Sequence, residues 1–381
     1  MKGVLCACLL AALQSMSPAR AYEADIHYST TYVLARAVGW SEADALIIAS
    51  VNQGVDENPD TVAALEVDRT SITSVTGFVT SSLRQAEKNL RFHCFSTSQV
   101  EAGKIAADVR KIVSGHFGAV PEHHDDPRRN TRRLIALGVA LHCQQDAHSH
   151  SGFGGSCGRH AGSCYGHSHR TFFDQLAFRL LGKHYFDPDH PGVSGERLFA
   201  ALRETANELA AHLPASSRRP LPPHQVAALS DALRASGIEL DDRVRRDCNR
   251  YIAGKWLLTV FRSSSVTRSG AEAVEKLSPQ IAGTCRNASF AAATVARIPD
   301  PRFPRLNADA SPYLVRADGT YQQILDESSG VSLQAIANYR THQTKVQLSN
   351  WKQLLALTLT AQVASSSATP IEPSHPHYKW E

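Results

Sequence analysis

Residues 134–150 read LIALGVALHCQQDAHSH, an apolar run that leads directly into three histidines and one aspartate. The apolar positions continue a helical pattern that starts near residue 131, so we predict one helix over residues 131–150. His142 and Asp146 are four residues apart, which places both side chains on one face of this helix, one turn apart. Two side chains in this arrangement can bind one metal ion, although the same spacing is common in surface hydrogen bonds.

The same periodicity recurs along most of the chain. Apolar side chains follow helical spacing over residues 27–38 and stop at Gly39, and Ser41 with Asp44 forms a capping-box pattern that starts a second helix. Alternation typical of strands is scarce, and only residues 69–81 are ambiguous. The sequence therefore predicts an all-α, multi-helix fold. Further helices are expected at residues 98–116, 168–183, 195–213, 223–236, 241–263 and about 332–363.

The N-terminal residues have the features of a cleaved signal peptide. Lys2 precedes the apolar residues 4–13, and the small-residue pattern at residues 19–21 (ARA) provides a cleavage site. We expect residues 1–21 to be removed and the protein to be secreted or periplasmic. No later stretch is long enough to span a bilayer, so we expect no transmembrane anchor. We assign residues 22–290 to one helical domain and residues 291–381 to a C-terminal extension with one long helix and a loose tail.

Six cysteines remain after the predicted cleavage. An even number in an exported protein predicts disulfides, although many pairings are open and thiolate ligation of zinc is an alternative. We expect Cys94 to pair with Cys143, which would connect two segments in which a histidine precedes the cysteine. The other expected pairs are Cys157 with Cys164 and Cys248 with Cys285.

Two residues near the N-terminus can approach the His142–Asp146 pair. His27 begins the first predicted helix and Asp56 ends the second. A tight turn at residues 39–41 makes the two helices antiparallel, which returns Asp56 to the neighbourhood of His27. The alternatives are a capped helix start for His27 and a loop acid for Asp56.

Two further groups fit the same site. His93 lies between phenylalanines, where a buried imidazole needs a polar partner, so it is either a ligand or a hydrogen-bonded core histidine. Signal cleavage would leave the α-amino group of Tyr22 five residues before His27. An unprotonated amine can bind zinc, so we include Tyr22 among the candidate ligands.

This arrangement resembles the zinc-dependent phospholipase C and S1/P1 nuclease superfamily, and within it an uncharacterised bacterial branch. The resemblance covers roughly residues 22–185, and it is carried by TTYVLARAVGWSEADALIIASVNQGVDE at residues 30–57 and LHCQQDAHSHSGF at residues 141–153. It implies a helical bundle that binds two to three zinc ions. It also implies hydrolysis of phosphoric esters by a metal-bound hydroxide, which zinc provides by lowering the pKa of water.

The resemblance assigns ligands to the first two ions. The amine of Tyr22 and the side chain of His27 would bind one ion. Asp146 would be shared between that ion and a second one, which would also be bound by Asp56, His93 and His142. Asp56 is in addition the expected orienter of the attacking hydroxide.

The third ion is where this chain departs from the family pattern. The family's next histidine normally lies six residues after the shared aspartate, and that position is Gly152 here. His150 is the nearest substitute, with His148 as a rival. On the following helix the candidates are His167 or His169 with Asp174, and we prefer His167 because a loop histidine just before a helix can point inward.

Composition narrows the function classes. A net charge of +4 in 381 residues gives no case for a stable nucleic-acid complex, while a phosphate-bearing substrate is compatible. No GxSxG or cysteine–histidine pattern in the sequence is a convincing nucleophile motif. We therefore expect an enzyme, an exported zinc-dependent hydrolase of phosphodiesters or phospholipids, and lipid, nucleotide and small-molecule substrates stay open. The alternative is a non-catalytic zinc-binding or adhesion protein that keeps the helical scaffold.

Overall fold

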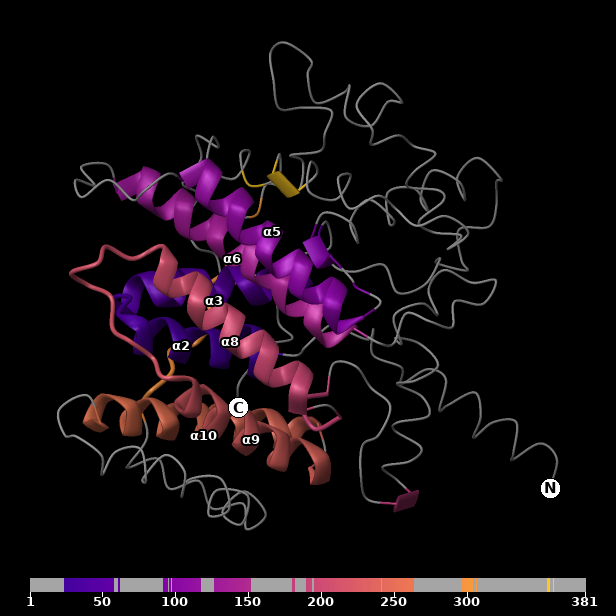
Figure 1. Ribbon diagram of the computed structural model, residues 1–381. Coiled ribbons are helices and arrows are strands. Elements are labelled where there is room, and N and C mark those ends of the chain that lie inside the picture. The colour runs from indigo at the N-terminus through magenta and orange to yellow at the C-terminus, as the bar shows by residue number, and fades with distance from the viewer. Residues whose placement is uncertain are drawn as a thin grey trace, which may run out of the picture.

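A computed structural model describes residues 24–57, 61, 92–94, 96, 98–117, 127–151, 180–181, 190–193, 195–240, 242–263, 296–303, 306, 355–356 and 359. Every regular element within these residues is helical (Figure 1), which confirms the predicted all-α fold. The elements are η1 (Asp25–Thr30), α2 (Thr31–Val38), α3 (Glu42–Glu57), α5 (Gln99–Phe117), α6 (Pro127–Ser149), α8 (Gly195–Ala211), α9 (Pro223–Glu239) and α10 (Asp242–Ser263). The helices predicted at residues 168–183 and 332–363, and the ambiguous residues 69–81, lie almost wholly outside the described residues.

The turn between the first two helices follows its sequence signals. Gly39 ends α2 with a φ of 123°, a conformation that side chains with a Cβ atom disfavour. Its position is also crowded, because a Cβ atom there would lie 2.2 Å from the carbonyl oxygen of Ser217. The amide of Asp44 donates to Ser41 Oγ at 3.1 Å and caps α3 as predicted.

The first predicted helix begins with a π-helical turn. Element η1 carries the candidate ligand His27 and runs directly into α2. The hydroxyls of Thr30 and Thr31 each donate to the carbonyl oxygen five residues earlier, at 2.7 Å and 3.3 Å. In these two bonds a threonine hydroxyl donates to a backbone carbonyl of the wider π-helical turn. Single π-helical turns are often found at functional sites.

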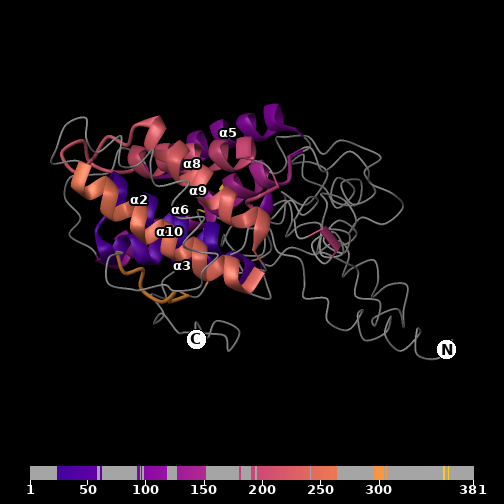
Figure 2. The same cartoon turned by 90° about the horizontal axis from the view of Figure 1, so that it is seen from below.

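Helix α6 is the central element of the bundle. It contacts α3, α5 and α8, and every side chain from residue 136 to residue 150 is buried. In Figure 1 helices α5 and α6 lie on one side of α8, and α9 and α10 lie on the other. Seen from below, α10 runs across the N-terminal helices (Figure 2), and it contacts both η1 and α2. Within the described part of the chain, no helix combines the length and apolar character needed to cross a membrane.

A buried ion pair fixes η1 against the C-terminal half of the domain. Asp25 Oδ2 accepts hydrogen bonds from Arg245 Nη1 at 2.6 Å and from Asn249 Nδ2 at 2.5 Å, both on α10. Asp25 and Arg245 are nearly inaccessible to solvent. Such a pair depends on both partners, because removing one leaves an uncompensated buried charge. It holds the segment that carries His27, two residues further along.

Parts of the predicted C-terminal extension also pack on the bundle. The amide of Arg302 donates to Ser50 Oγ of α3 at 3.0 Å, and the phenol of Tyr28 donates to the carbonyl oxygen of Pro299. Leu355 and Leu359 are fully buried in the same apolar core as the helices of the first domain. The described residues of the extension therefore cover η1 and α3.

Close packing of α3 on α6 depends on one glycine. A Cβ atom at Gly138 would lie 2.7 Å from Val51 Cβ and 2.8 Å from the carbonyl oxygen of Ile48, both on α3. Gly138 stands one turn before His142, so this contact sets how near the ligands of α3 and α6 can come. By contrast, a Cβ atom at Gly103 in α5 would meet nothing within 4 Å.

We predict opposite effects for two glycine-to-alanine substitutions. Gly138→Ala should lower the free energy of unfolding by about 1–3 kcal/mol, because α3 and α6 must separate. Gly103→Ala should raise it by roughly 0.5–1 kcal/mol, because alanine favours an exposed helical position. Urea unfolding of both variants measures this difference. Equal effects would show that Gly138 does not set the distance between α3 and α6.

Candidate metal centre

Five of the predicted ligands meet in one buried cluster. His27 comes from η1, Asp56 from the C-terminal end of α3, His93 from the segment before α5, and His142 and Asp146 from α6. Asp56 is 2% exposed and the other four are fully buried. Two overlapping groups, His27–Asp56–His142 and His93–His142–Asp146, have candidate ligand atoms within 4.8 Å of one another. We call these five residues the His–Asp cluster.

Four atoms of the cluster have the spacing of a tetrahedral metal site. His93 Nδ1 lies 2.7 Å from Asp146 Oδ2, and His142 Nε2 lies 3.1 Å from both of these atoms. Asp56 Oδ1 lies 3.5 Å from His142 Nε2 and 4.0 Å from His93 Nδ1. Tetrahedral zinc with bonds of about 2.0–2.1 Å places its donor atoms about 3.3 Å apart. The distances between these four atoms, 2.7 to 4.0 Å, lie on both sides of that value.

The remaining carboxylate oxygens face His27. Its Nε2 atom lies 3.3 Å from Asp146 Oδ1 and 3.7 Å from Asp56 Oδ2. Both aspartates therefore direct one oxygen towards the His93–His142 pair and the other towards His27. This arrangement suits two neighbouring ions that share their carboxylates, because each histidine offers only one inward nitrogen.

A hydrogen bond occupies the outer nitrogen of each imidazole. His142 Nδ1 lies 2.8 Å from the carbonyl oxygen of Asn52, and His93 Nε2 lies 2.9 Å from that of Thr61. His27 Nδ1 lies 2.7 Å from Gln145 Oε1. A carbonyl oxygen can only accept, so each of these outer nitrogens carries the proton and donates it. In a neutral ring that donates from its outer nitrogen, the inner nitrogen is a lone pair that can bind a metal ion.

The centre of the cluster is consequently a convergence of candidate metal ligands. Three inward imidazole nitrogens face two carboxylates at spacings of 2.7 to 4.0 Å. Burial lowers the pKa of His142 to about 3, which keeps its ring neutral. Burial raises the pKa of Asp146, but its interactions with His142 and hydrogen bonds from His27 and His93 hold that pKa well below its usual range. Neutral imidazoles and ionised carboxylates are the forms that bind a metal, so these groups could hold a metal ion.

An outer layer of amides and hydroxyls orients His27, and sequence reasoning missed it. Gln145 Oε1 also accepts from Asn52 Nδ2 at 3.0 Å, while Gln145 Nε2 donates to the hydroxyls of Thr31 and Thr205 at 2.9 Å and 3.0 Å. All four residues are fully buried. The sequence contained one signal for this layer. Asn52 precedes Asp56 by one helical turn and Gln145 adjoins Asp146, so both amides lie next to candidate ligands. Polar side chains of this kind fix the ring orientation of ligating histidines.

The predicted disulfide lies beside two of the ligands. Cys94 and Cys143 are bonded, with their Cα atoms 5.0 Å apart, which confirms that pairing. Each cysteine directly follows a ligand, His93 or His142. Cys94 has a φ of 45°, which is unusual for a residue other than glycine and is held by the cross-link. Cys248 is also disulfide-bonded, and its predicted partner lies outside the described residues.

The ligands predicted for the third ion are not gathered in the described residues. His150 is buried just after α6, where its amide donates to the carbonyl oxygen of Asp146 at 3.1 Å, but it belongs to neither group. His148 is also outside both groups and contacts Gln99 of α5. The predicted ligands Tyr22, His167 and Asp174 lie outside the described residues, so their roles stay predictions.

Comparison with known proteins gives a family match without a function. Residues 23–161 match the model of a family of unknown function, DUF6765. No curated protein and no solved structure matches the chain. The matched residues include the whole His–Asp cluster, so the cluster lies in the part of the chain that is similar to that family.

We predict that the Cys94–Cys143 disulfide supports metal binding as well as stability. The bond closes a loop between residues 49 apart. A Cys94→Ser, Cys143→Ser double variant should lose about 4 kcal/mol of unfolding free energy by the chain-entropy account. It should also bind zinc about tenfold or more weakly in a chelator competition, because His93 loses its cross-link to α6.

The matched control is Cys248→Ser, which removes a disulfide on α10 at a distance along the chain from the ligands. This variant should lose stability and keep its zinc affinity. Unchanged zinc affinity in the double variant would refute a role of the Cys94–Cys143 disulfide in positioning the ligands.

Proposed function

We propose that this protein is an exported zinc-dependent hydrolase of phosphoric esters. The observation that carries the proposal is the pair of adjacent donor groups that share the carboxylates of Asp56 and Asp146. Sites of this type, with two metals held side by side, are used for phosphoester hydrolysis in phosphatases and nucleases. The resemblance to the phospholipase C and S1/P1 nuclease superfamily supports the same reaction.

Donor chemistry favours zinc for this centre. Three imidazole nitrogens with two carboxylates form a mixed nitrogen and oxygen set, whereas calcium and magnesium take oxygen ligands. Two zinc ions would lower the pKa of bound water towards about 7 and neutralise phosphate oxygens. The site needs no serine or cysteine nucleophile for this chemistry.

The two donor groups suit different tasks. Asp56, His93, His142 and Asp146 offer four donors, which is the number that closes a structural zinc site. His27 with the second oxygens of the two carboxylates offers three donors among the described residues. Three protein ligands leave a position for water or substrate, which is the condition for a catalytic zinc. We therefore place the reacting phosphate on the His27 side.

The two aspartates also differ in how tightly they are held. Asp146 lies 2.7 to 3.3 Å from the three inward nitrogens. Asp56 lies 3.5 to 4.0 Å from the same nitrogens and is slightly exposed. We infer that Asp146 is the tighter of the two shared ligands, and that Asp56 binds metal and also orients the attacking hydroxide.

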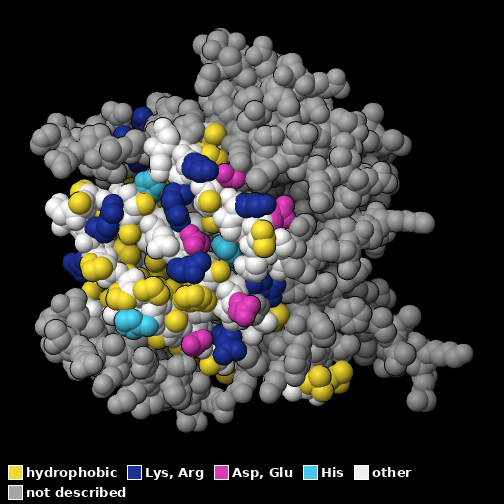
Figure 3. Space-filling view, viewed as in Figure 1, with side chains coloured by type: hydrophobic (Ala, Val, Ile, Leu, Met, Phe, Trp, Pro, Cys, Tyr) yellow, Lys and Arg dark blue, Asp and Glu magenta, His cyan; other side chains and the backbone are white. Residues whose placement is uncertain are grey.

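The substrate class stays open at the level of lipid, nucleotide or small phosphoester. On the face seen in Figure 3, side chains of Lys and Arg are interspersed with those of Asp and Glu. A nucleic-acid track would need a continuous basic stripe, so this face supports a small or lipid phosphoester over a stable nucleic-acid complex. Hydrolysis outside the cell also accords with the predicted signal peptide.

We predict zinc-dependent turnover in the wild-type protein. It should hold at least two zinc ions per chain and hydrolyse at least one of bis-p-nitrophenyl phosphate, phosphatidylcholine and single-stranded DNA. Asp146→Asn should lose zinc and activity together. Asp56→Asn should lower kcat/KM by about a hundredfold or more, because it removes a carboxylate that binds metal and orients the hydroxide.

Zinc content by mass spectrometry and initial rates measure these effects, and His224→Ala is the matched control. His224 is exposed at the start of α9 and should tolerate the change in both assays. Fewer than two zinc ions per chain would contradict the two-ion site. Two or more ions without turnover on any phosphoester would favour the alternative, a non-catalytic zinc-binding or adhesion protein.

A separate prediction concerns the N-terminal amine. If signal cleavage frees the amine of Tyr22, the amine would add a donor on the His27 side. Extending the mature chain by one methionine before Tyr22 should then remove one zinc ion and leave the His93–His142 ion bound. Mass spectrometry of the intact protein under native conditions counts the ions. An unchanged count would exclude the amine from the site.

A further inference from the structure

The side-chain amide of Gln145 lies behind His27, and its oxygen and both of its hydrogens are engaged. Gln145 Oε1 accepts from His27 Nδ1 at 2.7 Å and from Asn52 Nδ2 at 3.0 Å. Gln145 Nε2 donates to Thr31 Oγ1 at 2.9 Å and to Thr205 Oγ1 at 3.0 Å. A side-chain amide has one oxygen and two donor hydrogens, so these four contacts use all of its groups.

The neighbours of Gln145 decide which way its amide points. Asn52 Nδ2 also donates to Thr31 Oγ1 at 3.1 Å, and the Thr31 hydroxyl donates to the carbonyl oxygen of Ile26 at 3.3 Å. If the amide were turned over, the amino groups of Gln145 and Asn52 would face each other, and two donors would be opposed. The oxygen of Gln145 therefore faces His27, and His27 Nδ1 is the donor.

His27 differs in its support from the other two histidines of the His–Asp cluster. The outer nitrogens of His93 and His142 lie 2.9 Å and 2.8 Å from backbone carbonyl oxygens. The main chain holds those two acceptors in place, whereas the acceptor for His27 is the end of a side chain with rotatable bonds. The direction of the His27 ring therefore depends on the contacts that hold the Gln145 amide.

Thr205 is the contact that reaches this amide from α8. It is fully buried, and α8 carries none of the residues of the His–Asp cluster. Replacing Thr205 with valine would keep the shape of the side chain and leave one buried hydrogen of Gln145 Nε2 without its acceptor, which is unfavourable. The amide would lose one of its fixed contacts, and His27 would in turn lose a fixed acceptor.

We propose that Thr205 is a positioning residue for the metal ion on the His27 side, and that it acts through Gln145. The ion on the side of His93 and His142 would not depend on it, because backbone carbonyls orient those two rings. A change on α8 that touches no ligand would then release one ion and leave the other bound. This inference rests on the zinc centre of the proposed function and not on its hydrolytic activity.

Zinc titration of the full mature chain tests the proposal, with ions counted by native mass spectrometry and affinities measured by chelator competition. Thr205→Val should weaken one of the two ions by about tenfold or more and the other by less than about twofold, because an outer hydrogen-bond partner of a ligand has been lost. Thr205→Ser keeps the hydroxyl and should bring the affinity of the weakened ion back to near the wild-type value.

A second comparison identifies the ion that responds. His27→Ala should remove the ion on the His27 side outright. Adding Thr205→Val to His27→Ala should leave the affinity of the remaining ion unchanged, because the ring that Thr205 positions is already absent. The two single variants would then act on the same ion.

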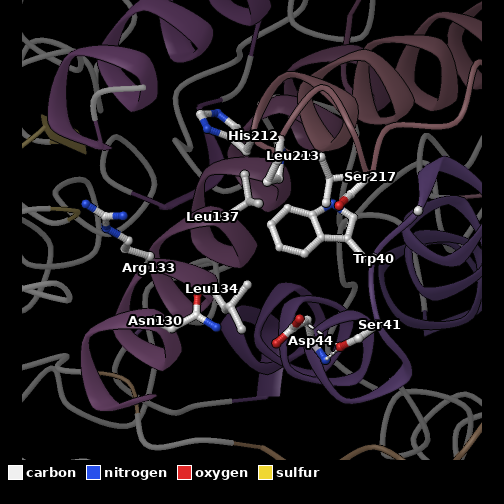
Figure 4. A pocket seen from close by; sticks show the side chains of 12 residues that line it. Trp40, Ser41, Asp44, Asn130, Arg133, Leu134, Leu137, His212, Leu213 and Ser217 are labelled. Atoms are coloured by element: carbon white, nitrogen blue, oxygen red, sulfur yellow. Dashed lines mark hydrogen bonds between the residues drawn. The ribbon is translucent and has the colours of Figure 1, made fainter. Parts of the chain in front are cut away.

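A packing variant just beyond the end of α8 controls for a general loss of stability. Leu213 is buried there and lines a cavity of about 290 Å³, in which Trp40 faces Leu134 and Leu137 (Figure 4). Leu213→Ala should lower the urea midpoint of the metal-free chain, because it removes buried apolar contacts. It should leave both zinc affinities unchanged, since it lies outside the layer around Gln145.

Three results would overturn the role of Thr205. They are equal weakening of both ions by Thr205→Val, a further loss of affinity when it is added to His27→Ala, and failure of Thr205→Ser to restore binding. Selective loss of the same ion in Leu213→Ala would also overturn it, because instability alone would then explain the effect. Fewer than two zinc ions in the wild-type chain would overturn the two-ion centre together with this inference.

Discussion

The hydrogen bond between His142 Nδ1 and the carbonyl oxygen of Asn52 is the contact on which the rest of the centre depends. It joins α6 to α3, and it decides which nitrogen of His142 faces the carboxylates. The same helix pair carries Asp56 and Asp146, so their separation follows from how closely the two helices pack. Gly138 permits that approach one turn earlier. The interface between α3 and α6 thus sets both the packing of the two helices and the geometry of the candidate ligands.

A cation at the centre of the cluster would stabilise the burial of these polar groups. Five titratable side chains are almost completely removed from water, and three nitrogens and two carboxylates face one another there. Buried charges and lone pairs of this kind are stable when paired or when they coordinate a metal. The outer shell of Asn52, Gln145, Thr31 and Thr205 satisfies the opposite side of the rings. The fold therefore holds a preformed set of candidate ligands, and a metal that bound them would stabilise the folded chain.

Much of this site could be predicted from the sequence, because its main signals are local. The four-residue spacing of His142 and Asp146 and the capped turn between α2 and α3 fix two pairs of residues by helix geometry alone. The adjacent histidines and cysteines predicted the disulfide, which the structure confirms. The all-α class followed from apolar periodicity over the same helices.

Other features depend on tertiary packing that no local pattern contains. The π-helical turn at His27 and the amide layer around Gln145 arise from contacts between η1, α3, α6 and α8. The cavity beside Trp40 forms where three segments distant in sequence meet, and its lining residues have ordinary spacing along the chain. Of the ligands proposed for a third ion, His150 joins neither group of the cluster, and His167 and Asp174 lie outside the described residues.

The most direct test of the metal centre is a crystal structure of the mature protein with diffraction data collected at the zinc absorption edge. The account predicts an anomalous peak within bonding distance of His93 Nδ1, His142 Nε2 and Asp146 Oδ2, and a second peak beside His27 Nε2. Crystals grown with zinc that show no peak at these nitrogens, or a cluster filled only by hydrogen-bonded water, would contradict it.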